Sequence, residues 1–89
     1  ADLAPAVGAR LAALAEAGQL LVITQQAHIA GRADRHLLAL KTSDDERTAS
    51  EVRTLTGETR VEELVRMIGA DTPEARQLAN DMLRAEGVA

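Results

Sequence analysis

The most apolar run in the chain lies in the segment Gln19–Thr24, and it predicts a buried strand. Its four consecutive apolar residues, Leu-Leu-Val-Ile, lack the alternation of a half-buried strand, which is typical of a central parallel strand covered on both faces. The run stops at Thr24 and continues into Gln25 and, shortly afterwards, His28. α/β proteins usually bind ligands at the end of such a strand. We therefore expect a candidate site at this polar corner.

The segment before the strand, Asp2–Ala17, predicts a helix. Pro5 is tolerated only in the first turn of a helix, so the helix should begin near Asp2 or Leu3, and Gly18 should end it. The larger apolar residues recur at helical spacing on one stripe: Leu3, Val7, Leu11 and Leu14. A helix that leads straight into a strand is half of a βαβ unit, so we expect this helix to cover part of a sheet.

The middle of the chain predicts a short helical turn followed by a hairpin. The expected elements are a helical turn at Gln26–Ala33 closed by Gly31, a strand at Arg35–Lys41, a polar turn at Thr42–Arg47 and an edge strand at Thr48–Thr56. Gly57 should end the second of these strands. The hairpin could then serve one edge of the sheet.

A third helix is predicted at Thr59–Gly69. Thr59 and Glu62 match the capping box, in which each side chain accepts a hydrogen bond from the other residue's free N–H. The expected buried stripe comprises Val61, Leu64, Val65 and Ile68. Gly69 should end this helix.

A fourth helix is predicted at Thr72–Glu86. Thr72 suits the N-cap, Pro73 the first helical position, and Gly87 a stop after the last turn. The expected stripe comprises Ala75, Leu78, Met82 and Leu83.

The order helix, central strand, short helix, antiparallel hairpin and two helices indicates an α/β fold that this chain does not complete. A central strand needs a neighbour on each edge, and the hairpin supplies only one. The other edge has no candidate strand, so we expect an exposed sheet edge unless another segment fills it.

Composition narrows the possible functions. The chain has 89 residues, no aromatic residue and no cysteine, so its core must be aliphatic and it has no disulfide or thiolate metal site. A net charge of −4 and the lack of aromatic side chains argue against nucleic-acid binding by this chain alone. A helix-turn-helix DNA binder built from Thr59–Glu86 is disfavoured because the last helix has no basic face. No apolar run is long enough for a membrane span, and no signal peptide is visible, so a cytoplasmic location is expected.

Two stretches resemble the C-terminal end of the RecN family, bacterial DNA-repair ATPases of the SMC-like branch of the ABC ATPases. Leu20–Leu40 is similar to the family's strand, switch loop and next strand, written V-T-H-L-P-Q-V-A followed by A-D-x-H. Arg60–Gly69 is similar to the family's helix R-[LV]-x-E-[LI]-A-R-M-L-[GS], the more specific motif. Gly8–Leu11 looks like the helix after the D-loop. The resemblance implies that residues 1–89 are the C-terminal lobe of a P-loop NTPase head.

The resemblance also implies a function that this chain does not perform alone. None of the six glycines belongs to a GxxxxGK[ST] loop, and the Walker B strand would lie upstream of Ala1. The complete head would use ATP and Mg²⁺ in double-strand break repair, with this segment completing the nucleotide-binding sheet. The implied partners are the N-terminal part of the same head, a second head in an ATP-bound dimer, and DNA through the full protein at the nucleoid. The alternative is a non-catalytic module, derived from such a head, that binds a protein partner.

The resemblance assigns the switch position to Gln25. In ABC-type ATPases a histidine at this position reaches the γ-phosphate. A glutamine can donate one hydrogen bond to phosphate or orient a water molecule, but it cannot become cationic. Thr24, Gln25 and His28 are therefore the candidate nucleotide-binding residues, with Gln25 as the candidate catalytic residue. His28 could replace the missing histidine, or it could be an ordinary exposed or half-buried imidazole.

Other polar residues have structural explanations beside functional ones. Arg66 follows Glu62 at the spacing of a helical ion pair, while an arginine finger is the alternative for Arg60 and Arg66. Glu62 and Glu63 are expected to be a cap and a solvated or paired face rather than acid–base partners. His36 is expected to open a strand, and Asp44–Glu46 to form a hairpin tip. No metal site is expected, because the two histidines lack matched cysteines or carboxylates.

Overall fold

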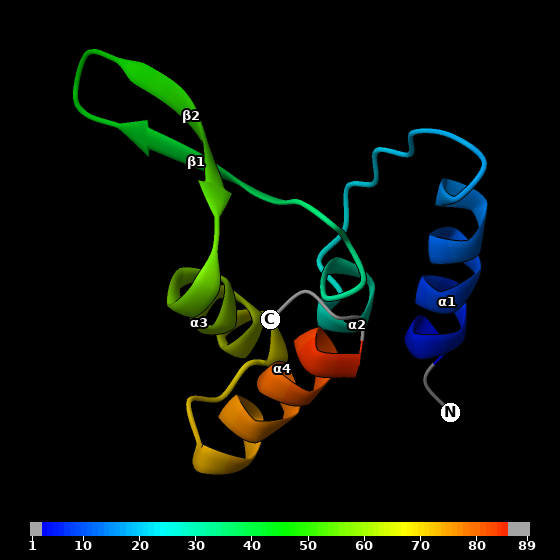
Figure 1. Ribbon diagram of the computed structural model, residues 1–89. Coiled ribbons are helices and arrows are strands. Elements are labelled where there is room, and N and C mark those ends of the chain that lie inside the picture. Colours follow the sequence, from blue (N-terminus) through cyan, green and yellow to red (C-terminus); the bar gives the residue numbers. More distant parts are fainter. Residues whose placement is uncertain (1–2, 86–89) are drawn as a thin grey trace.

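A computed structural model describes residues 3–85 of the chain (Figure 1). Asp2, Glu86 and Gly87, at the outer limits of two predicted helices, lie outside the described residues. The described elements are α1 (Ala4–Ala15), α2 (Ala27–Ala30), β1 (His36–Ser43), β2 (Thr48–Leu55), α3 (Gly57–Ile68) and α4 (Pro73–Ala85). They make four helices and one two-stranded antiparallel sheet. None of these helices combines the length and the apolar character that a bilayer crossing requires.

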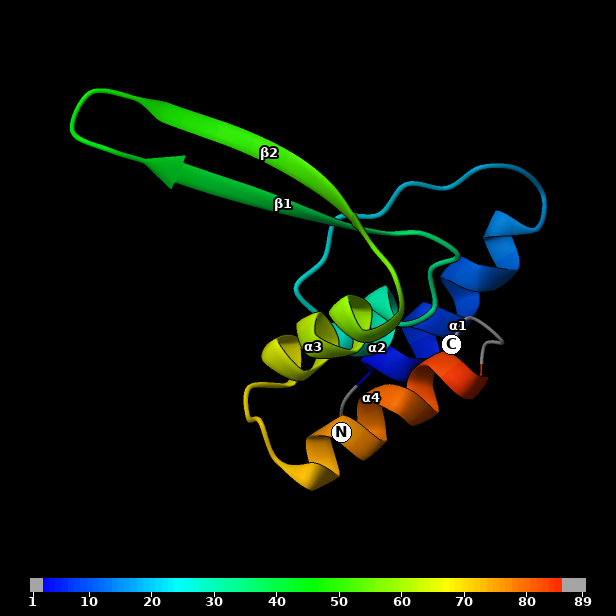
Figure 2. The same cartoon turned by 60° about the vertical axis from the view of Figure 1, so that its left-hand side comes forward.

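The hairpin of β1 and β2 projects away from the packed helices, as Figures 1 and 2 both show. The radius of gyration is 14.2 Å. A compact domain of this length would have a radius of gyration of about 12 Å. The difference reflects the projecting hairpin, because α2, α3 and α4 pack closely together.

The core lies between α2, α3 and α4. Its buried residues are Ala27, Ala30, Val61, Leu64, Val65, Ala75, Ala79 and Leu83, with Met67, Ile68 and Met82 packed around them. The expected stripe of α3 is confirmed, although Ile68 is only partly buried. On α4 the expectation for Leu78 was wrong: its side chain is 40% exposed, and Ala79 is fully buried instead. Ala75, Ala79 and Leu83 recur every four residues, so they share the face that meets α3.

The predicted start of α3 was wrong by two residues, whereas the predicted start of α4 is confirmed. α3 begins at Gly57, two residues before the prediction, because Thr56 rather than Thr59 is the N-cap. Thr59 lies at the third position, where its Oγ1 accepts a hydrogen bond from the Thr56 N–H at 3.2 Å. The predicted capping box of Thr59 and Glu62 was therefore wrong. α4 starts as predicted, with Thr72 Oγ1 accepting a hydrogen bond from the Ala75 N–H at 3.1 Å.

The predicted hairpin is confirmed. β1 and β2 pair antiparallel, from His36 opposite Leu55 to Ser43 opposite Thr48. Asp44 closes the turn, since its Oδ1 accepts hydrogen bonds from the backbone N–H groups of Glu46 at 2.9 Å and Arg47 at 2.7 Å. The acidic run is thus a turn at the tip of the hairpin, as expected.

The central strand predicted at Gln19–Thr24 is absent. The segment is irregular and connects α1 to α2 (Figure 1). Leu21 and Ile23 are 79% and 96% exposed. A strand requires a neighbour for its backbone hydrogen bonds, and the strands within residues 3–85 pair only with each other. The predicted sheet of mixed topology is therefore reduced to one hairpin in this chain.

The apolar stripe predicted on the first helix is also not buried. Leu3, Val7 and Leu14 are 71%, 43% and 64% exposed. α1 instead packs on α2, with Gly8 directly against the backbone of His28. The buried residues of α1 are the small Ala4 and Gly8. Leu11, the fourth residue of the predicted stripe, is half-buried, so only Leu3, Val7 and Leu14 are exposed.

Candidate functional site

The three predicted nucleotide-binding residues lie at the entry to α2. Thr24 is half-buried, and its Oγ1 accepts a hydrogen bond from the backbone N–H of Gln26 at 3.0 Å. Gln26 has extended backbone angles and is the N-cap of α2. Gln25 is exposed, and His28 is half-buried within the helix. The segment thus turns directly from the irregular run into α2, with the Gln25 side chain free to meet solvent.

Thr24, Gln25 and His28 are close along the chain, but their side chains do not bond to one another. Within residues 3–85, no hydrogen bond links any two of them. The exposed amide of Gln25 can donate to an anionic oxygen or orient a water molecule. The role of Gln25 at the switch position and the replacement of the family histidine by His28 therefore stay predictions.

The sequence did not reveal how α2 is held from outside. Arg60, in the first turn of α3, is 4% exposed. Its Nη2 donates hydrogen bonds to the carbonyl oxygens of Ala30 at 3.1 Å and Ala33 at 2.6 Å. These carbonyls end α2 and the turn after it, so the guanidinium caps the C-terminal end of the helix. Arg60 is therefore not poised as an arginine finger.

Burial governs the electrostatics around Arg60. Desolvation lowers the pKa of the Arg60 guanidinium, while the Asp34 carboxylate opposes this shift. Burial, and then the positive charge of Arg60, lower the pKa of His36, while Glu63 opposes. His36 Nδ1 and Arg60 Nε are both buried without a hydrogen-bond partner. His36 therefore opens its strand as expected, as a buried imidazole that favours the neutral form.

Arg66 pairs with Glu63 rather than with the predicted Glu62. Arg66 Nε donates to the two carboxylate oxygens of Glu63 at 2.9 and 3.0 Å, and its Nη2 donates to Oε1. The Glu63 side chain is 8% exposed and that of Arg66 is 70% exposed. Glu63 lies three residues before Arg66 on the edge of the buried face, whereas Glu62 points to solvent. The predicted ion pair of Arg66 with Glu62 was therefore wrong.

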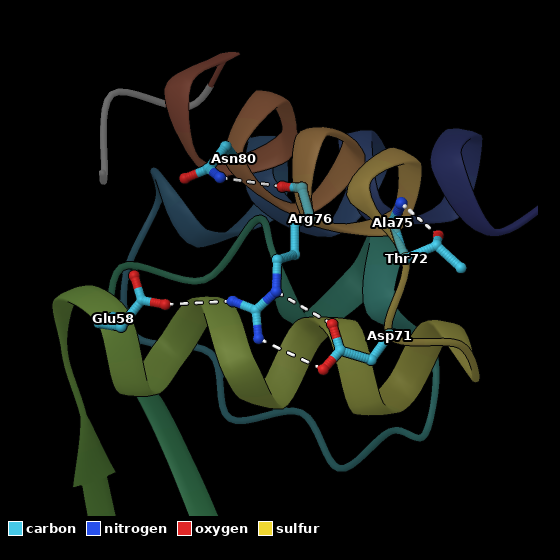
Figure 3. A network of polar contacts seen from close by, with 6 residues as sticks. All are labelled: Glu58, Asp71, Thr72, Ala75, Arg76 and Asn80. Carbon is cyan, nitrogen blue, oxygen red and sulfur yellow. Dashed lines mark hydrogen bonds and ion pairs between the residues drawn. The ribbon is translucent and has the colours of Figure 1, made fainter.

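A shallow open depression lies between α3 and α4, and polar side chains fill much of its rim. Arg76 donates hydrogen bonds to Asp71 Oδ1 at 3.0 Å and to Glu58 Oε1 at 3.2 Å (Figure 3). It thereby ties the start of α3 to the loop before α4. The depression is lined by Glu62, Val65, Arg66, Gly69, Ala70, Asp71 and Arg76. Arg66, Asp71 and Arg76 are already engaged in ion pairs along its rim, while the Glu62 carboxylate is exposed.

Residues 3–85 contain no group of three or more histidine or acidic side chains that could hold a metal ion. The carboxylates at the hairpin tip belong to the turn itself. The candidate residues lie at the entry to α2, and Arg60 caps the opposite end of that helix.

No family model matches the chain. It is similar to proteins described as DNA repair protein RecN. The identity is 47% over 70 residues with the protein of Deinococcus radiodurans, covering 79% of this chain and 12% of the relative. It is 44% over 79 residues with that of Streptomyces coelicolor, covering 86% and 14%, and 41% over 86 residues with that of Treponema pallidum, covering 94% and 15%. The chain thus spans between 12% and 15% of the length of these curated relatives.

Proposed function

Because the chain belongs to the RecN family of DNA-repair proteins, we propose that it is the C-terminal lobe of that family's ATPase head. Residues 1–89 form one lobe of a P-loop NTPase fold of the ABC type, which is completed by the N-terminal part of the same head. In the complete head this segment fills a place in the nucleotide-binding sheet and carries the switch position.

The exposed run Leu20–Ile23 is the observation that carries this proposal. It is apolar throughout and lies open to solvent, with Ile23 96% exposed. Soluble proteins cover such runs, because each buried side chain of this size contributes roughly 1.5–3 kcal/mol. The exposed stripe of α1 adds Leu3, Val7 and Leu14 to the uncovered apolar surface. A sheet supplied by the rest of the head would pair the backbone of the run and cover both sets of side chains.

The switch position follows from the place of Gln25. It comes directly after the run, where the end of a paired strand would meet the nucleotide. Gln25 then donates a hydrogen bond to the terminal phosphate or orients the attacking water, and Thr24 and His28 line the same corner. ATP and Mg²⁺ bind through residues of the N-terminal part, and hydrolysis proceeds in a head–head dimer. DNA binds to the full cytoplasmic protein at the nucleoid rather than to this acidic segment.

The experiment measures steady-state ATP hydrolysis by the complete protein that carries this segment. Gln25→Ala should lower kcat at least about tenfold, as expected for one lost transition-state hydrogen bond of about 1.4 kcal/mol or more. Gln25→His should keep kcat at the level of the unsubstituted protein or raise it, because histidine is the family residue. Gln19→Ala is the matched control, since Gln19 is an exposed glutamine at the other end of the same run. An unchanged kcat in Gln25→Ala would refute the switch assignment and favour a non-catalytic module.

A further inference from the structure

The helix at the candidate site cannot be stable by itself. α2 has four residues, far fewer than the 12 or so that an isolated helix needs in water. Its position therefore depends on contacts from other elements. Ala27 and Ala30 anchor one face of α2 in the core against α3 and α4. Gly8 of α1 lies against α2 on another side, and Arg60 of α3 holds its C-terminal end.

A continuous series of hydrogen bonds joins the corner to Arg60. Thr24 Oγ1 accepts from the Gln26 N–H at 3.0 Å, and the Gln26 carbonyl accepts from the Ala30 N–H at 3.0 Å. The Ala30 carbonyl accepts from Arg60 Nη2 at 3.1 Å. Gln25 lies between the first two residues of this series. A displacement of Arg60 would therefore be transmitted to the backbone that carries the Gln25 side chain.

Arg60 itself is held firmly. The next residues of α3, Val61 and Leu64, are 6% and 0% exposed in the core. The guanidinium is buried, and Asp34 is close enough to favour its charged form. Its second carbonyl partner, Ala33 at 2.6 Å, fixes the turn between α2 and β1. A lysine has no planar fork and could satisfy both carbonyls only with poorer geometry.

We propose that Arg60 is a positioning residue for the switch corner: by capping α2 it sets where Gln25 stands relative to the nucleotide. The inference rests on the proposed function of Gln25, since Arg60 touches no substrate and acts through α2. Its effect should fall on the chemical step, because ATP is bound chiefly by groups outside this segment.

The test uses the complete protein and the variants Arg60→Met, Arg60→Lys and Arg66→Met. Arg60→Met should lower kcat about tenfold, as expected for a displaced catalytic group, while KM for ATP stays within about twofold. Arg60→Lys should recover part of kcat and also serves if Arg60→Met fails to fold. Arg66→Met is the control, because the Arg66 side chain is 70% exposed and pairs with Glu63 of its own helix. Equal kcat in folded Arg60→Met, Arg66→Met and the unsubstituted protein would overturn the proposal. If Arg60→Met does not fold, full activity of Arg60→Lys would overturn it.

A double-substitution cycle separates this proposal from the function on which it rests. If Arg60 acts through Gln25, the Arg60 substitution should change kcat by less than about twofold in the Gln25→Ala background. Fully additive effects would overturn the positioning role while leaving the switch role of Gln25 intact. If the Arg60 variants lower kcat but Gln25→Ala does not, both the switch role of Gln25 and the positioning role of Arg60 are refuted.

Discussion

A Cβ atom on Gly8 would lie 2.9 Å from the carbonyl oxygen of His28, so α1 approaches α2 at a point where only glycine fits. The same atom would lie 3.2 Å from the Arg32 side chain. The neighbour at 2.9 Å is backbone and cannot move away at low cost. This contact brings the first helix against the helix that carries the candidate site.

Gly8→Ala should therefore destabilise the 89-residue chain by about 1–3 kcal/mol, the usual cost of overpacking. Urea unfolding followed by circular dichroism measures this change. Gly18→Ala is the matched control, because nothing lies within 4 Å of a Cβ at Gly18. Equal midpoints for the two variants would contradict the close approach of α1 and α2.

Stability should also fall on acidification because of His36. Burial lowers the pKa of this imidazole below its ordinary value of 6.5, so the folded state binds its proton less readily than the unfolded state. The contribution of the neutral imidazole is complete above the unfolded pKa and is lost as the pH falls below it toward the folded pKa. Unfolding measured from about pH 7.5 to about pH 5.5 should show this decline.

His36→Gln should flatten the decline, because glutamine does not titrate. His28→Gln provides the control, since His28 is a half-buried histidine of α2 and is not among the groups that shift the pKa of His36. If the free energy of unfolding falls equally steeply with decreasing pH in the two variants, the explanation is wrong.

The pair of Glu63 and Arg66 should be detectable by comparing two neutral substitutions. Glu63→Gln removes the bidentate partner of Arg66, whereas Glu62→Gln removes an exposed carboxylate with no side-chain contact to Arg66. Because Arg66 is largely exposed, the loss for Glu63→Gln should be on the order of 1 kcal/mol or less and should shrink in high salt. A larger loss of stability for Glu62→Gln than for Glu63→Gln would instead support the pair of Glu62 and Arg66 that the sequence spacing suggested.

Elements held by local interactions could be predicted from the sequence. The hairpin turn is set by Asp44, and the start of α4 by Thr72 and Pro73, through bonds that span two or three residues. The C-terminal end of α3 follows from Gly69, whose φ of 103° favours glycine.

Features that depend on distant partners could not be predicted in the same way. Leu20–Ile23 reads as a central strand, but a strand exists only where a neighbour pairs with it. The bond from Arg60 to Ala30 spans 30 residues, and no periodicity marks a side chain that caps another helix. The choice of Glu63 over Glu62 depended on which helical face is buried. The candidate residues themselves were found from the family motif rather than from packing.

The most direct test of the proposed head is hydrogen exchange at the run Leu20–Ile23 in the complete protein. If the rest of the head pairs with this run, its backbone amides should exchange at least about a hundredfold more slowly than the amide of Asp45 in the hairpin turn. Protection should extend across consecutive residues, as in a strand with neighbours on both edges. Exchange as fast as that of Asp45 would show that the run stays unpaired, and it would contradict the proposal that this segment completes a nucleotide-binding sheet.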